Sequence, residues 1–342
     1  MSTANLLQPN RGTDRLQQEF MNRVVCARTA IPAQFRNSPS IRFTGDSLGL
    51  EAEIIVKLES LNPIRSFKGR GTSWYVQQLL SEYAAKGSEN HLVCASAGNF
   101  GQGLAVSCKL HGLALTVCAP KNASPSKVQQ MRLLGAEVIL EGEDFDSAKS
   151  TAVQFAQRTG ARFVEDGSDP SLMEGAATIA AELLEQEPRI SCLLVPVGNG
   201  SLVNGIAKYV KLTYPNLQVI GVCPAGAPSM ELSFRAGHPV STDNVRTIAD
   251  GLAVRVPVAE AVREMCQWVD DVILVSDDSI RAAQKLLACN HSLLSEPSGA
   301  AGIAGLLEHG KSLKRFVGKD GMFATVLCGA SLGLEGIRRI FI

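Results

Sequence analysis

Residues 66–71 read Ser-Phe-Lys-Gly-Arg-Gly, and this short stretch directs the interpretation of the whole chain. It follows an apolar segment, EIIVKL (53–58), which is predicted to be a β-strand. A lysine on a solvated surface needs neither a phenylalanine before it nor a glycine after it. A lysine that performs covalent chemistry does need such neighbours, because its amine must be held in place and kept largely neutral. Lys68 is therefore the first candidate catalytic residue.

Short apolar runs recur along the chain and alternate with longer amphipathic segments. The predicted strands lie at 53–58, 91–96, 114–120, 137–142, 192–197, 218–223, 271–276 and 324–329. Between them lie helical patterns such as KVQQMRLLG and DSAKSTAVQFAQRTG, each closed by a glycine that suits a helix end. This alternation predicts the α/β class, with parallel sheets covered by helices on both faces. Residues 1–50 have no such pattern and are expected to be irregular.

Length and charge limit the organisation and the partners of the chain. Its 342 residues exceed one typical domain of about 100–200 residues, so two domains are expected. We predict a large domain from 1–85 and 168–342, with a small domain at 86–167 inserted in it. The 33 basic and 33 acidic side chains balance, which gives no footprint for nucleic acid or an anionic membrane. The expected partner is a small molecule.

Cysteine usage indicates the compartment. The nine cysteines occur singly, with no C-x-x-C pair and no metal-ligand spacing. This pattern argues against a disulfide framework or a zinc site and favours a reducing environment. The first residues contain no apolar core of a secretion signal, and no apolar stretch reaches the ~20 residues of a membrane span. We therefore expect a cytoplasmic protein.

Three glycine-rich turns stand where a predicted strand leads into a helix. They are SAGNFGQG (96–103), VGNGSL (197–202) and CGASLG (328–333). In open α/β sheets such turns lie at the carboxyl ends of strands, where ligands bind. Successive backbone N–H groups at a helix N-terminus bind anions. Any one turn could serve packing alone, but three turns together with Lys68 indicate a site.

Two stretches come close to nucleotide-binding motifs, but neither fits. The turn at 198 does not follow G-x-G-x-x-G, and the next strand ends in Cys223, not in an acidic residue that would hold a ribose. The stretch GLLEHGKS (305–312) formally matches a phosphate-binding P-loop. A P-loop follows a strand, whereas here the preceding residues look helical and Gly310 is expected to end that helix. The match is attributed to chance.

With these motifs in view, the chain resembles the fold-type-II pyridoxal-phosphate enzymes, the tryptophan synthase β-like superfamily. Within that superfamily it is most similar to serine/threonine dehydratases (ammonia-lyases) and serine racemases. The resemblance runs from about residue 20 to 335 and rests on seven motifs in the family's order. These are KLESLNPIRSFKGRG, SAGNFGQGLA, KVQQMRLLGAEVIL, VPVGNGSLVNG, TIADGLAVR, SEPSGAAGIAGLL and TVLCGAS. It implies two open, twisted, mostly parallel sheets with pyridoxal 5'-phosphate in the cleft between two domains.

The resemblance also implies a role for individual residues. Lys68 is expected to form the Schiff base, with Phe67 beneath the pyridine ring and Arg70 as a structural support. The other cofactor-binding residues implied are Asn99, Gly198, Asn199, Gly200, Ser201, Leu202, Glu296 and Cys328. The substrate-binding residues implied are Ser96, Ala97, Gly98, Asn99, Phe100 and Gln102.

The resemblance places Cys328 beside the pyridine nitrogen. A thiol is a weak donor, so the nitrogen should stay largely unprotonated, which favours elimination. The alternative for Cys328 is a packed thiol at a buried strand end, where free cysteines usually lie.

Several positions depart from the family pattern. Asn199 and Ser201 interrupt a phosphate loop that is usually four glycines, and Phe100 stands where many relatives carry His or Ala. Cys223 and Ser229 replace acidic metal ligands, and because a thiol and a hydroxyl bind a hard cation poorly, no metal site is expected.

These observations predict β-elimination of ammonia from a β-hydroxy amino acid such as threonine, serine or 3-hydroxyaspartate. One alternative is β-replacement, as in cysteine or diaminopropionate synthases, although those relatives usually carry S-x-K-D-R. Another is a binding protein that has lost catalysis. Arg65 is either solvated or ion-paired at the surface, or directed inward to meet an acidic substrate side chain. A homodimer is expected.

Overall fold

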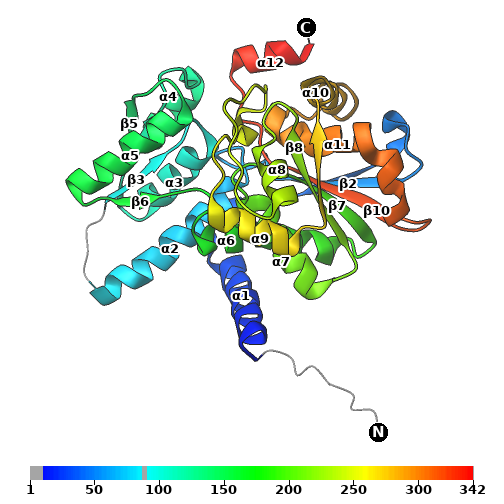
Figure 1. Cartoon of the computed structure of the whole chain (residues 1–342), viewed down its shortest axis with the longest axis horizontal. Helices are drawn as coiled ribbons and strands as arrows, with labels where there is room; N and C mark the ends of the chain where they lie inside the picture. The colour runs from blue at the N-terminus through cyan, green and yellow to red at the C-terminus, as the bar shows by residue number, and fades with distance from the viewer. Residues whose placement is uncertain (1–10, 87–90, 342) are drawn as a thin grey trace.

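The computed structural model describes residues 11–86 and 91–341, which form two sheets with helices packed on them (Figure 1). The larger sheet has six strands in the order β1-β2-β10-β7-β8-β9. Their bounds are β1 Ser40–Thr44, β2 Glu53–Leu58, β7 Ile190–Pro196, β8 Gln218–Pro224, β9 Asp271–Val275 and β10 Met322–Leu327. All neighbouring strands are parallel except β1, which pairs antiparallel with β2 at the edge.

The smaller sheet has four parallel strands in the order β5-β4-β3-β6. Their bounds are β3 His91–Ala95, β4 Ala114–Ala119, β5 Glu137–Leu140 and β6 Arg162–Val164. All eight predicted strands are present, and the α/β class with two mostly parallel sheets is confirmed. The division of the chain at 85/86 and 167/168 stays a prediction.

Twelve α-helices connect these strands in the described residues. They are α1 Arg11–Ala30, α2 Lys68–Lys86, α3 Asn99–Leu110, α4 Pro125–Leu133, α5 Phe145–Thr159, α6 Pro170–Gln186, α7 Ser201–Thr213, α8 Ser229–Ala236, α9 Ala259–Trp268, α10 Asp277–His291, α11 Pro297–Leu313 and α12 Leu334–Phe341. None of the helices in the described ranges is both long and apolar enough to cross a membrane.

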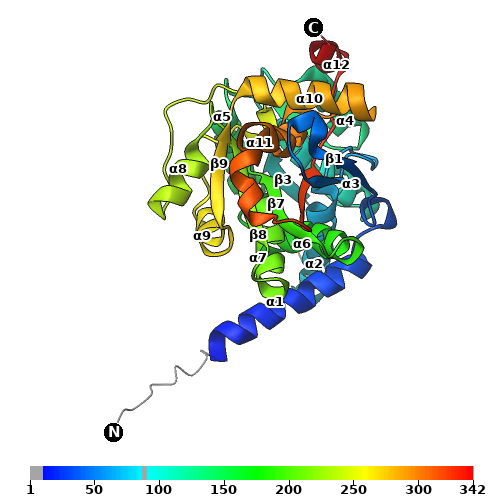
Figure 2. The same ribbon diagram turned by 90° about the vertical axis from the view of Figure 1, so that its right-hand side faces the viewer.

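Alternating strand residues build a core on each face of the larger sheet. Leu193 and Val219 pack into a cluster with α6, α7 and α9. Their neighbours Leu194 and Ile220 point to the other face and pack with α10 and α11. This two-residue period is what a strand buried on both sides requires, and the helices that cover the two faces are visible in Figures 1 and 2.

Helix α2 joins the two sheets. It begins at Lys68, next to the larger sheet, yet its Tyr75, Val76 and Leu79 lie in the core of the smaller sheet.

A local signal fixes the start of α5. Asp144 accepts the Ser147 N–H at 2.8 Å, which is a typical N-cap.

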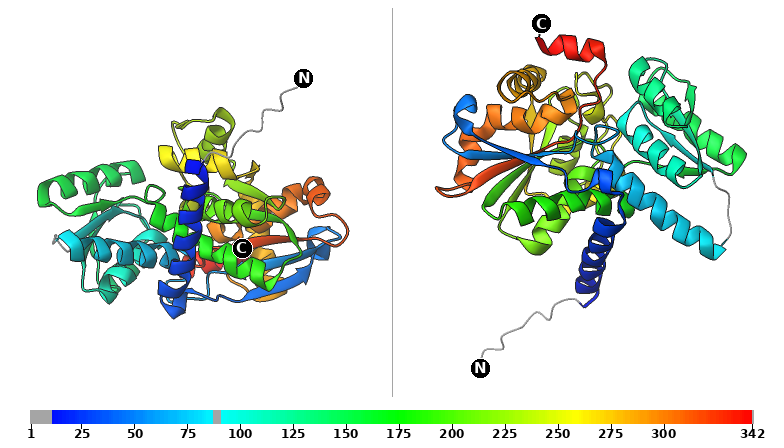
Figure 3. Two further views of the ribbon diagram at one scale, coloured as in Figure 1. Left: turned by 90° about the horizontal axis from the view of Figure 1, so that it is seen from below. Right: turned by 180° about the vertical axis from the view of Figure 1, so that it is seen from behind.

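The expectation that residues 1–50 are irregular is wrong. They contain α1, a 20-residue helix, and strand β1. Phe20, Val24 and Ala27 are buried at helical spacing. The sequence of α1 therefore contains an apolar stripe, but the stripe is narrow and lies among polar residues. Helix α1 packs on α6 and α2 and runs across the underside of the molecule (Figure 3).

The expected helix end at Gly310 is also wrong, because α11 continues to Leu313. A Cβ at Gly310 would lie 2.5 Å from the Leu50 side chain. Packing against Leu50, and not the end of the helix, therefore explains this glycine. The stretch 305–312 lies inside α11, so it has no P-loop geometry.

Candidate active site

A cavity of ≈ 490 Å³ lies between the two sheets. It is lined by residues at the carboxyl ends of strands from both sheets, including Ala95, the last residue of β3, and Pro196, the last residue of β7. The predicted site residues that line it are Phe67, Lys68, Ser96, Ala97, Gly98, Asn99, Phe100, Gly198, Asn199, Gly200, Ser201, Leu202, Glu296 and Cys328. Gln102 is the exception. It is buried, and its Nε2 donates to Ser331 Oγ at 3.2 Å.

Lys68 is the first residue of α2 and reaches into this cavity. The Phe67 N–H donates to the Cys328 carbonyl oxygen at 3.1 Å, which ties the start of α2 to the end of β10. The Lys68 Nζ lies 4.7 Å from the centre of the Phe67 ring and 2.5 Å from Asp166 Oδ2. Its side chain is only 16% exposed and is ion-paired with Asp166, so the amine is held in one place.

The turn from Ser96 to Gln102 is organised by one hydroxyl group. Ser96 Oγ accepts the Gly98 N–H at 3.1 Å and the Gly101 N–H at 2.9 Å. A Cβ at Gly98 would lie 2.8 Å from Lys127 Cδ, so a larger residue does not fit there. Because α3 begins at Asn99, the turn presents a helix N-terminus to the cavity, and such a terminus binds anions.

The turn from Gly198 to Leu202 presents the N-terminus of α7, which begins at Ser201. Gly200 has φ +94°, a left-handed conformation that favours glycine. A Cβ at Gly198 would lie 2.7 Å from the Gly251 carbonyl oxygen. The glycines at 198 and 200 are thus required despite the intervening asparagine, and the turn presents a second helix N-terminus, a feature suited to anions.

Four polar residues meet at the floor of the cavity. The Asn99 Nδ2 donates to Glu296 Oε1 at 2.5 Å, and the Lys127 Nζ lies 2.7 Å from Asp250 Oδ2 and 3.5 Å from Glu296 Oε2. Burial would lower the pKa of Lys127, but the charges of Glu296 and Asp250 outweigh it and raise that pKa. Burial raises the pKa of Glu296. Sequence reasoning missed Lys127 and Asp250, although both stand in quoted motifs.

Two atoms in this group fit an absent ligand. Asn99 Oδ1 is buried and has no hydrogen-bond partner in the described part of the chain, and the buried Glu296 Oε2 has only the long 3.5 Å contact with the Lys127 Nζ. Buried polar atoms are nearly always paired, so a bound hydroxyl or ring donor would complete them. Together with the two anion-binding turns, they fit the ring and phosphate of pyridoxal phosphate.

Cys328 lies at the end of β10 with its thiol facing the cavity wall. Its Sγ is 3.5 Å from the Ser298 carbonyl oxygen, to which it donates. Burial raises the pKa of this thiol, so Cys328 is a neutral group. A thiol beside the cofactor ring and a thiol that only fills space at a strand end would both be buried. Cys328 differs from an ordinary packed cysteine only in that it lines the cavity.

Three other candidates lie outside the cavity. Arg65 is exposed and does not line it, so the surface interpretation is the one that agrees with the structure. Cys223 is buried in β8. Ser229 Oγ donates to the Val254 carbonyl oxygen at 2.6 Å. The described residues contain no cluster of three His, Cys, Asp or Glu side chains suited to a metal. Independence from metal stays a prediction.

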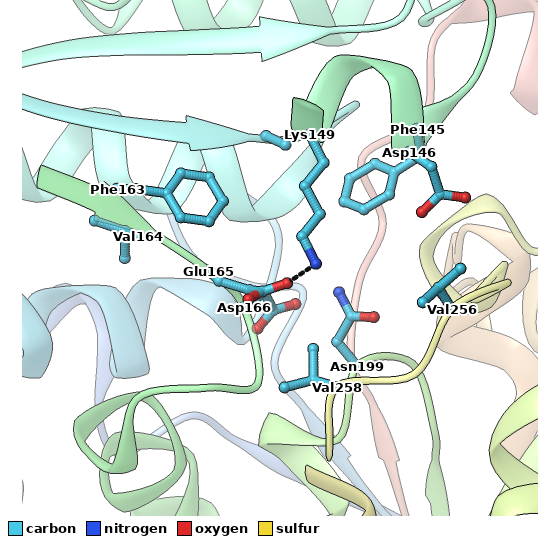
Figure 4. A pocket seen from close by; sticks show the side chains of 11 residues that line it. Phe145, Asp146, Lys149, Phe163, Val164, Glu165, Asp166, Asn199, Val256 and Val258 are labelled. Atoms are coloured by element: carbon cyan, nitrogen blue, oxygen red, sulfur yellow. Dashed lines mark ion pairs between the residues drawn. The ribbon is translucent and has the colours of Figure 1, made fainter. Parts of the chain in front are cut away.

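A small recess of ≈ 20 Å³ adjoins the cavity and shares Asp166 and Asn199 with it (Figure 4). Lys149 and Glu165, which both line the recess, form an ion pair. The volume suffices for about one water molecule and not for a substrate. Asp166 belongs to none of the seven sequence motifs. It lines both the recess and the cavity, and it contacts Lys68 and Ser201 at the start of α7.

The sequence and the fold place the chain in one family. The model of the family described as "Pyridoxal-phosphate dependent enzyme" matches residues 31–329. The chain belongs to this family of pyridoxal-phosphate dependent enzymes, and pyridoxal phosphate is its cofactor.

Two relatives bear names of threonine-cleaving enzymes. The chain is 34% identical to a biosynthetic L-threonine dehydratase of Pasteurella multocida over 322 residues, which are 94% of this chain and 61% of that protein. It is 37% identical to an L-threonine ammonia-lyase of Geobacter sulfurreducens over 284 residues, 83% of this chain and 68% of that protein. The chain thus spans about three fifths of the length of the first relative and two thirds of the second.

Solved structures agree in fold. The processed form of threonine deaminase isoform 2 from Solanum lycopersicum superposes with a TM-score of 0.85 at 28% identity, covering 96% of this chain and 88% of that one. Maize serine racemase gives a TM-score of 0.85 at 26% identity, covering 94% of this chain and 96% of that one.

Proposed function

We propose that the protein is a pyridoxal-phosphate-dependent ammonia-lyase that converts a β-hydroxy amino acid to a 2-oxo acid and ammonia. The observation that carries the proposal is that Lys68 and two anion-binding turns, 96–102 and 198–202, line one cavity. A substrate that carries a carboxylate and a cofactor that carries a phosphate need two such turns beside one amine. Threonine, serine and 3-hydroxyaspartate are the candidate substrates.

In this proposal each part of the site has one task. Gly198, Asn199, Gly200, Ser201 and Leu202 hold the cofactor phosphate, and Asn99, Glu296, Phe67 and Cys328 surround its ring. When bound, pyridoxal phosphate supplies an electron sink for the α-carbon of the substrate. The neutral Cys328 thiol gives the ring nitrogen no strong counter-charge, which suits elimination. The turn beginning at Ser96 binds the substrate carboxylate through backbone N–H groups.

Lys68 has two successive tasks in this proposal. Its amine first anchors the cofactor and is then displaced by the amine of the substrate. The freed Nζ takes the α-proton as a general base. Loss of the β-hydroxyl group and hydrolysis of the product then give one oxo acid and one ammonia for each amino acid consumed.

A screen for oxo-acid release tests the reaction. The unmodified protein loaded with pyridoxal phosphate should release 2-oxobutyrate from L-threonine or pyruvate from L-serine, or oxaloacetate from 3-hydroxyaspartate, with an equal amount of ammonia. Cofactor without protein is the control, since pyridoxal phosphate alone reacts slowly. If a β-substituted amino acid forms from O-acetylserine and sulfide while no hydroxy amino acid yields an oxo acid, the β-replacement alternative holds.

The reaction should proceed without racemisation because of Ala97. This residue lines the cavity in the turn predicted to bind the carboxylate, and serine racemases, which the chain resembles, carry serine at this position. A methyl group neither gives nor takes a proton, so Lys68 acts from one face alone.

Chiral chromatography of the remaining substrate measures this. We expect negligible opposite enantiomer from the unmodified protein and measurable racemisation from Ala97→Ser. Ala97→Gly, which also lacks a hydroxyl, is the matched control and should not racemise. Appreciable opposite enantiomer from the unmodified protein would mean that another residue supplies the second proton.

We also propose that the protein acts in the cytoplasm as a homodimer. All nine cysteines are free thiols, which suits a reducing compartment. Large apolar side chains such as Leu16, Val25 and Leu133 are more than half exposed in the single chain. A two-fold dimer is the commonest way to cover such side chains in a homo-oligomer.

A further inference from the structure

Asp166 is the one acidic side chain in contact with the Lys68 amine among the described residues. It follows β6, and Gly167 after it has φ +93°. A Cβ at Gly167 would lie 2.1 Å from the Asn199 carbonyl oxygen. The segment that carries Asp166 is therefore pressed against the turn of α7, and any residue other than glycine at 167 would force it away.

Each carboxylate oxygen of Asp166 has one partner. Oδ2 lies 2.5 Å from the Lys68 Nζ, and Oδ1 accepts a hydrogen bond from Ser201 Oγ at 2.7 Å. The Asp166 side chain is 13% exposed, so water contributes little to its solvation. It is a largely buried carboxylate with two polar partners, the Lys68 amine and the Ser201 hydroxyl group.

Both partners are groups that the proposed function assigns to the cofactor. Lys68 carries the amine that would anchor the cofactor, and Ser201 begins the helix whose N-terminus would face the phosphate. Asp166 therefore lies within proton-transfer distance of the proposed base and next to the proposed phosphate turn.

We propose that Asp166 relays the α-proton from Lys68 to the departing β-hydroxyl group. The proposal rests on the proposed function. Lys68 takes the α-proton, so that its amine becomes an ammonium. The ammonium passes that proton over the 2.5 Å contact to the Asp166 carboxylate.

The Cβ–O bond breaks with its electron pair on oxygen, the Asp166 carboxyl proton goes to that oxygen, and water leaves. The lysine is again a neutral amine and Asp166 is again a carboxylate. The net result is transfer of the α-proton to the leaving oxygen, with no proton drawn from solvent. A single residue in contact with both Lys68 and the phosphate turn suits this task, because the leaving group must depart within reach of the base.

The test exploits a leaving group that needs no acid. Chloride departs unprotonated, whereas hydroxide must leave as water. With Asp166→Asn, we expect the initial rate on L-serine to fall by about 10²-fold or more, the usual contribution of a general acid. The rate on β-chloro-L-alanine, which gives the same pyruvate, should fall less than about 10-fold, within the effect of an altered hydrogen bond.

Three further measurements show that the variant is intact. The absorbance of the bound cofactor and the borohydride-reduced adduct on Lys68 should match those of the unmodified protein. Exchange of the α-proton of L-alanine for deuterium, followed by NMR, should persist, because alanine has no leaving group. If Asp166→Asn does not load cofactor, Asp166→Glu serves instead. It keeps a carboxyl group that can relay a proton and should retain activity on serine.

Glu165→Gln is the matched control. Glu165 is the preceding residue, pairs with Lys149 and lines only the recess, so both rates should stay near those of the unmodified protein. Three outcomes overturn the role of Asp166 and leave the proposed function standing. They are an equal loss of rate on serine and β-chloroalanine in Asp166→Asn, full retention of the serine rate in that variant, and loss of the serine rate in Asp166→Glu. An unmodified protein that releases pyruvate from neither substrate, nor an oxo acid from any hydroxy amino acid, overturns the proposed function and this inference with it.

Discussion

Lys68→Ala should lower the rate of oxo-acid release by roughly 10³-fold or more, the scale of loss seen when a covalent catalyst is removed. Lys68 supplies both the covalent anchor of the cofactor and the base for the α-proton in the proposed mechanism. An alanine provides neither function. The variant should also lose the pyridoxyl adduct that borohydride traps on the unmodified protein, which peptide mapping by mass spectrometry would place on the peptide containing residue 68.

Lys149→Ala is the control for this substitution. Lys149 lies in the recess beside the cavity and pairs with Glu165, so its loss should leave the adduct in place. Lys127 is the other buried lysine of the cavity and is the serious competitor. An adduct mapped to Lys127, or one that persists in Lys68→Ala, would contradict the assignment of the whole site.

The parts of the site that sequence reasoning located share one property. Lys68, the turn at 96–102 and the turn at 198–202 each stand at the start of a helix, with glycines that mark a tight turn. Such local signals are written in a few consecutive residues. All but one of the predicted site residues line the cavity. Gln102 does not, because being in the turn does not decide which way a side chain points once the helix has begun.

The residues that sequence reasoning missed depend on contacts over long separations. Asp166 reaches Lys68 across 98 residues, and Lys127 reaches Asp250 across 123. These contacts follow from the order of strands in the two sheets. Strand β6 has only three residues, too few for a periodic pattern. Without that strand in the prediction, nothing indicated that Asp166 follows the edge of the smaller sheet and faces the cavity.

Arg70, the other charged residue of the stretch 66–71, explains how Lys68 is supported. Arg70 is fully buried. Its guanidinium donates to both oxygens of Glu59 at 2.8 Å and to the two oxygens of Glu182 at 2.6 and 2.8 Å. Lys57 lies 2.9 Å from Glu182 Oε2. Two bases and two acids thus balance inside the protein and bind the first turn of α2 to β2 and α6.

Arg70→Leu should therefore destabilise the protein by roughly 3–5 kcal/mol, the range for breaking a buried ion pair by removing one partner. The substitution leaves two buried carboxylates facing one lysine. Urea unfolding of the cofactor-free protein measures the loss. Arg28→Leu is the control, because Arg28 makes the same two-pronged contact with Glu185 at 2.6 Å but at the exposed surface, where a pair contributes about 0–1 kcal/mol.

The Arg70–Glu182 ion pair makes the destabilisation by Arg70→Leu depend on pH. Burial alone would raise the pKa of Glu182, but the hydrogen bonds and charge of Arg70, with the charge of Lys57, lower it to about 2 from the ordinary 4.5. A carboxyl group whose pKa is lower in the folded state stabilises that state above pH 4.5, and this stabilisation is lost as the pH falls toward 2. The urea midpoints of the unmodified protein and Arg70→Leu should thus lie far apart at pH 7 and converge toward pH 3. A gap that stays constant over this range would mean that Arg70 acts by packing alone. A gap that closes would mean that charge holds the first turn of α2, and with it Lys68, in position.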